Sequence, residues 1–322
     1  MRLAGNLLLA VLVLAALAIA ATYWRAGQRE AAARAAYPPL GQILDVGGVQ
    51  VHAHVTGAGP DIVLIHGAGG SLRDFTFDLA ARLSDRYRVI AFDRPGHGHT
   101  DAADTAGRRF DAPRQQAALL QAAARQLDIA RPLVVGHSFG GSVALAWALE
   151  QPGDTAGVVL LAGATMPWPG TLNASYRINS SLLGGALVVP AITAWVPLPY
   201  ARQVLAGIFA PQPMPESYPA EFGLPMALRR GLLRANARQV NGLRPHVVEM
   251  SGDYPGLEIP VELLHGDADE IVPLHVHSGP LSALLPDAVL TVLPGVGHMP
   301  HHAMPDHVTA AVDRVAERAG LR

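Results

Sequence analysis

The sequence predicts an α/β fold: a mostly parallel central sheet with flanking helices, an inserted helical cap and a preceding N-terminal apolar helix. Short apolar runs bounded by turn residues, such as Ile62 to Ile65 and Val158 to Ala162, alternate with longer stretches of helical pattern. The alternation stops at residue 166 and resumes after residue 253. Such alternation is typical of a parallel sheet with helical crossovers, and its interruption predicts an insertion between two strands.

The N-terminal segment, residues 1–24, predicts a transmembrane anchor or an uncleaved signal. Leu3 to Trp24 is almost wholly apolar, and a helix of roughly 20 apolar residues is long enough to cross a bilayer. Tyr23 and Trp24 stand where aromatic residues mark the membrane interface. A cleaved signal peptide is the alternative, because Ala18-Ile19-Ala20 has the form of a cleavage site. We expect the chain to contact a membrane through residues 3–24.

The charges beside this segment leave its orientation open. Arg25, Arg29 and Arg34 follow the apolar segment and only Arg2 precedes it, so the positive-inside rule places the rest of the chain in the cytoplasm. A short tail before a single apolar helix is instead typical of an export signal. We expect the folded domain on the exported side, periplasmic or extracellular.

A helical stem and the first part of the folded core come next. Residues 25–39 are rich in alanine and arginine and predict a helix that ends at Tyr37-Pro38-Pro39, since proline cannot donate to the helical hydrogen bonds. Alternating apolar residues around Gly47-Gly48 predict a β-hairpin. Further strands are expected at 62–65, 87–92, 133–135 and 158–162, and helices at 71–83, 113–127 and 141–149. Together these elements form the first part of the core, residues 40–165.

The cap and the second part of the core complete the chain. Residues 166–253 are proline-rich, apolar and irregularly helical, which predicts a cap insertion. In residues 254–322 the strand pattern resumes at 261–264 and 289–293, and Asp306 to Ala319 predicts a closing amphipathic helix.

Composition excludes several classes of function. The net charge of -2 and the lack of basic runs outside the N-terminus predict no nucleic-acid partner. The chain has no cysteine, which excludes disulfides, thiolate nucleophiles and cysteine-ligated metals. It shows no phosphate loop and no dinucleotide fingerprint. The glycines at 67, 69 and 70 follow a strand, but such a cluster is weak evidence for nucleotide binding, so we expect no cofactor.

The segment 136–140, Gly-His-Ser-Phe-Gly, joins an apolar strand to a helical pattern. Glycines on both sides of Ser138 leave room for a strained turn that presents the hydroxyl at the sheet edge. Alone the pattern is only moderately specific, because a helix-capping serine after a buried strand gives the same match.

A serine hydroxyl becomes a nucleophile when a base removes its proton and a third group orients that base. His298 follows the last expected strand, and Asp269 follows the strand before it. Loops after successive parallel strands meet at the same sheet edge, so Ser138, Asp269 and His298 can converge there. Asp267 is the alternative acid.

Five motifs in this order resemble the α/β-hydrolase fold family, in particular its capped bromoperoxidase-like and esterase-like serine hydrolases. They are the elbow 136–141, the loop His-Gly-Ala-Gly-Gly at 66–70, Asp-Arg-Pro-Gly-His-Gly at 93–98, Gly-Asp-Ala-Asp at 266–269 and Gly-Val-Gly-His at 295–298. The resemblance covers the chain from about residue 40 to its end. It implies that Asp269 orients the base while Asp267 caps the turn, and that the backbone N–H groups of Ala68 and Phe139 form an oxyanion hole.

Other candidate residues receive structural interpretations. His301 and His302 lie close to His298, but no carboxylate or cysteine in the sequence completes a ligand set, so we expect exposed loop histidines and no metal site. Asp93 is expected to hold its loop in place. The resemblance implies that a dehalogenase or epoxide hydrolase would carry aspartate at position 138, where this chain has serine.

The sequence therefore predicts a membrane-anchored serine hydrolase that cleaves a carboxylic ester of a small or lipophilic substrate through an acyl-enzyme intermediate. The same triad also supports hydrolysis of a carbon–carbon bond or an amide, and acyl transfer. A catalytically silent, membrane-tethered binding protein is a further alternative, disfavoured by the intact triad and oxyanion loop.

Overall fold

The computed structural model describes residues 2–322, and its centre is one eight-stranded sheet with the strand order β1-β2-β4-β3-β5-β6-β7-β8. The strands are β1 (Gln42–Asp45), β2 (Gln50–Thr56), β3 (Asp61–Ile65), β4 (Arg88–Phe92), β5 (Leu133–His137), β6 (Gly157–Leu161), β7 (Val261–Gly266) and β8 (Ala288–Leu293). β1, β2 and β4 pair antiparallel, and all other neighbours pair parallel. The predicted mostly parallel sheet is confirmed.

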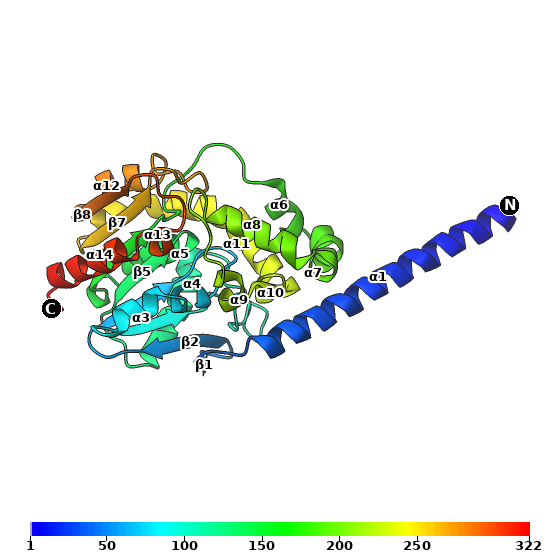
Figure 1. The fold of residues 1–322 in the computed structure, drawn as a ribbon, viewed down its shortest axis with the longest axis horizontal. Coiled ribbons are helices and arrows are strands. Elements are labelled where there is room, and N and C mark those ends of the chain that lie inside the picture. The colour runs from blue at the N-terminus through cyan, green and yellow to red at the C-terminus, as the bar shows by residue number, and fades with distance from the viewer. Residues whose placement is uncertain (1) are drawn as a thin grey trace.

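Helices cover both faces of the sheet (Figure 1). One face packs on α4 (Pro113–Arg125), α5 (Phe139–Glu150) and α12 (Ser278–Leu284), and the other on α2 (Arg73–Thr76), α3 (Leu79–Ser84) and α14 (Pro305–Arg318). The three central strands β3, β5 and β6 are buried almost throughout because they lie between these two layers. Such burial explains their continuous apolar sequences.

Between β6 and β7 the chain forms a layer of helices above the carboxyl edge of the sheet. Its elements are α6 (Ala174–Ser180), the π-helical turn η2 (Gly184–Val188), α7 (Val189–Trp195), α8 (Leu198–Ile208), α9 (Tyr218–Phe222), α10 (Leu224–Ala227), α11 (Arg230–Ser251) and the 3₁₀ turn η3 (Tyr254–Gly256). Phe209, Tyr218 and Phe222 form a small core with Met299 of the loop after β8. This layer is therefore packed against the sheet domain by apolar side chains of its own.

The N-terminal helix α1 (Arg2–Ala36) is continuous and projects far from the rest of the molecule (Figure 1). Among the described residues it is the one single helix long and apolar enough to cross a membrane, although length and composition fit a signal sequence equally well. Its second half packs on α7 and α10 of this helical layer, which is called the cap below, and Ala26 and Ala33 are buried there. The helix ends immediately before Tyr37-Pro38-Pro39, as the prolines predict.

Three features differ from the sequence prediction. The helix expected at 71–83 is divided into α2 and α3, because the backbone of Asp78 leaves the helical region at φ −150°. α5 begins at Phe139, two residues earlier than expected, since the turn at Ser138 leads directly into the helix. Three further short elements lie outside the prediction, namely α12, η1 (Pro152–Asp154) and α13 (Pro300–Ala303).

Candidate active site

Ser138 lies on a strained turn between β5 and α5. Its backbone has φ 53° and ψ −118°, which non-glycine residues rarely adopt. A methyl group on Gly136 would overlap the carbonyl of Gly140, and one on Gly140 would overlap the carbonyl of Ile65 in β3. Glycine at both positions therefore allows the turn to approach the neighbouring strand, as the motif predicts.

The loop His66–Gly70 lies directly beside this turn. β3 and β5 pair parallel with Ile65 opposite Gly136, so the segments that follow them leave the sheet together. A Cβ atom on Gly67 would lie 3.1 Å from Cβ of Ser138. Within residues 2–322, neither the N–H of Ala68 nor that of Phe139 donates to a protein acceptor. Two unused amides thus flank the serine from adjacent loops.

A fully buried arginine, Arg94, holds the loop that contains Ala68. Its guanidinium donates to the carbonyl oxygens of His66 (2.9 Å) and Gly67 (3.0 Å) and to the side-chain oxygens of Gln116 and Gln239, both at 2.9 Å. Burial lowers the pKa of Arg94 to about 9, which still leaves the group charged near neutral pH. The carbonyl oxygen of Gly67 points toward this cation. The N–H of Ala68 belongs to the same trans peptide unit, so it points the other way and stays unused.

His298 and Asp269 form a buried pair in the loops after β8 and β7. His298 Nδ1 donates to Asp269 Oδ2 at 2.7 Å, and the other carboxylate oxygen accepts the N–H groups of Ile271 and Val272, both at 2.9 Å. The second contact fixes the carboxylate in place, and the first orients the imidazole so that Nε2 carries the free lone pair.

A histidine that the sequence analysis did not single out, His265, supports this carboxylate. His265 Nε2 lies 3.3 Å from Asp269 Oδ2, and its Nδ1 lies 2.6 Å from the hydroxyl of Ser278. Burial alone would raise the pKa of Asp269, but hydrogen bonds from His265 and His298 outweigh burial and lower it well below the usual range. Asp269 is therefore ionised at neutral pH.

Asp267 occupies a different position. Its side chain is exposed, and its Oδ1 accepts the N–H of Gly295 at 2.6 Å. This contact ties the loop after β7 to the loop after β8, which agrees with the turn-capping interpretation. The carboxylate bound to His298 belongs to Asp269.

The reactive atoms of Ser138 and His298 are unoccupied by other protein groups. Within the described chain, Ser138 Oγ and His298 Nε2 make no hydrogen bond, to each other or to other residues, yet neither belongs to the buried atoms without a partner. Both atoms therefore reach a solvent-accessible space. A serine and a carboxylate-oriented imidazole on one sheet edge form an arrangement capable of nucleophilic catalysis.

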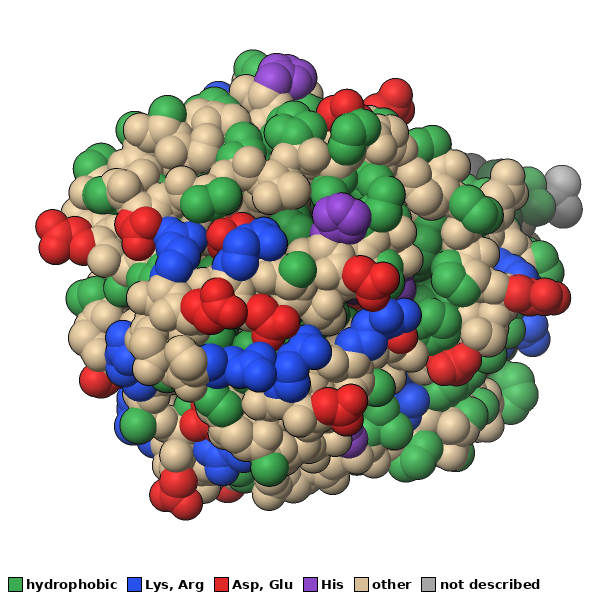
Figure 2. All heavy atoms as spheres, turned by 60° about the vertical axis from the view of Figure 1, so that its left-hand side comes forward, with side chains coloured by type: hydrophobic (Ala, Val, Ile, Leu, Met, Phe, Trp, Pro, Cys, Tyr) green, Lys and Arg blue, Asp and Glu red, His purple; other side chains and the backbone are tan. Residues whose placement is uncertain are grey.

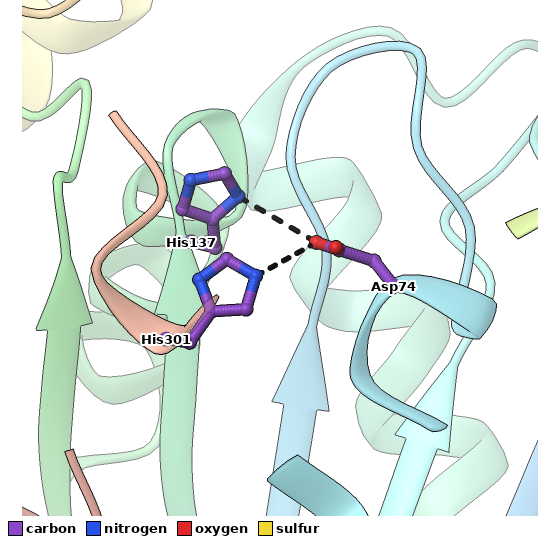
Figure 3. A group of neighbouring side chains, drawn as sticks. All are labelled: Asp74, His137 and His301. Carbon is purple, nitrogen blue, oxygen red and sulfur yellow. Dashed lines mark hydrogen bonds and ion pairs between the residues drawn. The ribbon is translucent and has the colours of Figure 1, made fainter. Parts of the chain in front are cut away.

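A second cluster, built around Asp74 of α2, lies beside the serine turn. Asp74 Oδ2 accepts from His301 Nε2 (3.1 Å) and lies 3.9 Å from His137 Nδ1, as Figure 3 shows. Its Oδ1 accepts from His302 Nε2 (2.8 Å) and from the hydroxyl of Tyr218 in the cap (2.6 Å). The side chains come from four distant segments of the chain.

The expectation of exposed loop histidines at 301 and 302 is wrong. His301 is 1% exposed, and both residues belong to the short helix α13, where the ring of His301 lies against Phe75 of α2. The carboxylate that the local sequence lacked is Asp74, which lies 227 residues away from His301 in the chain. Asp74, His137 and His301 offer ligand atoms that all lie within 4.8 Å of one another, so these three could hold a metal ion.

Hydrogen bonds already account for most of this cluster. Burial raises the pKa of Asp74, but the charges and hydrogen bonds of His301 and His302 outweigh it and lower the pKa well below its usual range. Burial lowers the pKa of His137, whose Nε2 donates to the carbonyl oxygen of His298 at 2.9 Å. The cluster thus links the residue before Ser138 to the backbone of His298.

The sequence model of the alpha/beta hydrolase family matches residues 62–312. The chain belongs to the alpha/beta hydrolase family. Haloalkane dehalogenase 2 of Mycobacterium tuberculosis is 28% identical over 289 residues, which cover 86% of this chain and 94% of the relative. Membership of the family makes the chain a hydrolase.

Solved structures of other alpha/beta hydrolases share this architecture. A thermophilic esterase from Thermogutta terrifontis superposes with a TM-score of 0.68 at 20% identity, over 86% of this chain and 99% of the esterase. A membrane phospholipase A, described as a bacterial virulence factor, superposes with a TM-score of 0.63 at 21% identity. That match covers 98% of this alpha/beta hydrolase and 99% of the phospholipase, so it includes most of α1.

Proposed function

We propose that this alpha/beta hydrolase is a serine esterase that cleaves a carboxylic ester of a small or lipophilic substrate. Ser138 is the nucleophile, His298 the general base and acid, and Asp269 the group that orients the base. The observation that carries the proposal is the buried His298–Asp269 pair, 2.7 Å apart, on the sheet edge that also presents Ser138 and two unused amides.

The reaction would proceed in two steps. Ser138 Oγ attacks the ester carbonyl while His298 Nε2 takes its proton, and the N–H groups of Ala68 and Phe139 donate to the oxyanion. Collapse of the tetrahedral intermediate breaks the bond to the leaving alcohol, which receives the proton from His298. Water then attacks the acyl-enzyme by the same route and releases the acid and free Ser138.

The residue at the elbow argues against dehalogenation. The resemblance implies that displacement of a halide needs an aspartate nucleophile, and position 138 carries serine. The similarity to a haloalkane dehalogenase therefore extends to the fold and not to the proposed chemistry.

Labelling with a fluorophosphonate tests the nucleophile directly. The Ser138→Ala variant should lose both labelling and turnover of short p-nitrophenyl esters. Ser282→Ala is a matched control, because that hydroxyl donates only to the carbonyl of Gly279 in α12. Labelling retained in Ser138→Ala, or wild-type protein that never labels, would disprove the assignment. A wild type that labels but cleaves only amides or carbon–carbon bonds would change the reaction and keep the triad.

We propose also that α1 remains attached as a membrane anchor, with the hydrolase domain on the exported side. The chain contains no cysteine, so a single introduced thiol can report sidedness. Val289→Cys is suitable because this side chain is 44% exposed on β8, far from α1. A membrane-impermeant maleimide should label it in intact cells. The mass of the membrane-bound protein should include residues 1–20, and loss of that segment would show a cleaved signal instead.

A further inference from the structure

The part of the cap nearest to α1 exposes large apolar side chains. Leu182, Leu183 and Leu187 are 86%, 76% and 52% exposed, and Trp195 is 53% exposed. They belong to the segment from the end of α6 to the end of α7, and Figure 1 shows α7 lying against α1 on the side from which the N-terminal half projects. Exposed apolar clusters of this kind mark interaction surfaces.

Two hydrogen bonds fix the level of this surface along α1. The hydroxyl of Tyr23 donates to the carbonyl oxygen of Ala186 at 2.7 Å, and Trp195 Nε1 donates to Thr22 Oγ1 at 3.1 Å. The exposed leucines therefore lie beside the end of the apolar segment of α1. A helix of about 20 residues spans roughly 30 Å at 1.5 Å per residue, which is the thickness of the hydrocarbon core. Residues after Tyr23 then lie at the level of the lipid headgroups.

A cleft lies at this level, between α1 and the end of α7. It has a volume of about 750 Å³. One side of the cleft is lined by α1, with Trp24, Arg25, Gln28, Arg29 and Ala32, and the other side by the segment 195–198. The guanidinium of Arg25 stacks over the ring of Trp195, 4.7 Å from its centroid. The cleft thus combines two cations with two aromatic side chains, which suits a charged group at a membrane interface.

Neither cation in the cleft has an acidic partner among residues 2–322. Arg25 Nε donates to the carbonyl oxygen of Ala194 at 2.9 Å, and Arg29 Nη1 donates to those of Ala194 (3.1 Å) and Val196 (2.8 Å). These contacts hold both guanidinium groups at the C-terminal end of α7 and leave their other N–H groups unused. The two cations repel each other. Burial, together with this repulsion from Arg25, lowers the pKa of Arg29.

Glu30 is the one acidic residue of α1, and its carboxylate is already bound. Glu30 binds Arg230 of α11 through both carboxylate oxygens, at 2.9 and 2.8 Å. The positive charge in the cleft is therefore left for a group that comes from outside the chain. A phosphate diester suits two adjacent guanidinium groups because it offers several acceptor oxygens and a negative charge.

We propose that this cleft binds the headgroup of an anionic phospholipid, and that the leucines at 182, 183 and 187 insert beside it. The hydrolase domain would then rest on the membrane by its cap instead of hanging freely from α1. This proposal depends on the membrane attachment proposed above and is independent of the ester chemistry. The charge between α1 and α7 selects the anionic lipid, and the adjacent apolar surface makes a lipid the occupant in preference to free phosphate.

The experiment uses the full chain with Ser138→Ala, so that no lipid is hydrolysed, reconstituted in vesicles of phosphatidylcholine. The added thiol of Gln28→Cys carries a bimane label inside the cleft, and the same label on Val289→Cys reports the distant β8 edge. That edge lies on a side of the molecule where basic and acidic side chains alternate, as in the view of Figure 2. Quenching is measured with phosphatidylglycerol or phosphatidylcholine brominated near the headgroup end of the acyl chains.

The label at position 28 should be quenched by brominated phosphatidylglycerol at a mole fraction about tenfold lower than by brominated phosphatidylcholine, because each arginine near the surface contributes about fivefold at most. Arg25→Gln with Arg29→Gln should remove the preference. Arg34→Gln should reduce it much less, because Arg34 does not line the cleft and lies about 14 Å from Arg25 and about 8 Å from Arg29 along α1 at 1.5 Å per residue. Thermal unfolding verifies that each variant is folded.

Three outcomes would overturn the proposal. Equal quenching by the two lipids would show ordinary lipid around α1, and a preference that survives the double variant would place the selective contact elsewhere. Displacement of brominated phosphatidylglycerol by inorganic phosphate alone would show a free anion site. Loss of esterase activity would affect none of these measurements, so failure of the two proposals can be separated.

Discussion

Replacing Asp269 by asparagine tests the proposed base orientation most sharply. The amide has nearly the same shape, and its oxygen can still accept the N–H groups of Ile271 and Val272 that now bind Oδ1 at 2.9 Å. Its NH₂ group must then face His298 Nδ1 and His265. An amide N–H can only donate, so His298 Nδ1 becomes the acceptor and its proton moves to Nε2. The base that should receive the proton of Ser138 is thereby lost.

The expected loss follows from this tautomer change. Asp→Asn exchange in a serine triad lowers kcat by about 10⁴-fold, which corresponds to roughly 5.5 kcal/mol at 1.36 kcal/mol per tenfold. We expect a fall of about 10³- to 10⁴-fold here, because the two backbone hydrogen bonds keep the side chain in place while the orienting acceptor is removed. The stopped assay is hydrolysis of p-nitrophenyl butyrate, with kcat and KM measured separately, and KM should change little.

Asp267→Asn is the matched control. That side chain is exposed and accepts the N–H of Gly295, a bond that the asparagine oxygen can also accept. Its kcat should stay within about twofold of wild type, because surface substitutions that keep their contacts cost little. The reasoning is refuted if Asp269→Asn keeps more than a tenth of the wild-type kcat, or if Asp267→Asn loses as much.

Three further predictions concern stability. Gly140→Ala should prevent folding or lower the free energy of unfolding in urea by more than about 3 kcal/mol, because its methyl group overlaps a strand carbonyl. Gly242→Ala in α11 is the control, and it should be neutral or stabilising because the space at its Cβ is open. Tyr218→Phe should cost about 2 kcal/mol by removing the donor to ionised Asp74, and an unchanged Tm would contradict that hydrogen bond. Burial lowers the pKa of His66 from 6.5 to about 4. As the pH falls, the unfolded chain therefore binds a proton at His66 before the folded chain does. Stability should therefore fall by up to about 3 kcal/mol as pH drops from 6.5 to 4, and a flat urea midpoint across this range would exclude it.

The sheet and the loops around Ser138 could be predicted because their signals are local. Apolar runs buried on both faces, and glycines where a turn meets a neighbouring strand, are direct consequences of contacts a few residues away. Chain order then places Asp269 and His298 on the same edge as Ser138. The split of the helix after residue 70 was missed because a single non-helical residue, Asp78, leaves the apolar pattern unchanged.

Contacts between distant segments could not be predicted in this way. His301 and Asp74 are separated by 227 residues, and nothing near His301 indicates a buried carboxylate. Arg94 was placed in a recognised loop, but its contacts with Gln116 of α4 and Gln239 of the cap depend on how three segments pack. The cleft beside α1 likewise exists only because α7 packs against that helix.

Buried polar contacts make the cap an integral part of the site. Tyr218 of α9 donates to Asp74, which in turn accepts from His301 and lies beside His137. The hydrogen bonds therefore run from a cap helix through Asp74 to α13, and His137, beside this carboxylate, separately donates to the backbone of His298. An opening of the cap that separates Tyr218 from Asp74 would leave an ionised carboxylate short of a donor, which costs more than the loss of apolar contact alone. Substrate entry should therefore proceed by local movements of α6 to α8, where several large apolar side chains are exposed, while α9 stays fixed over the site.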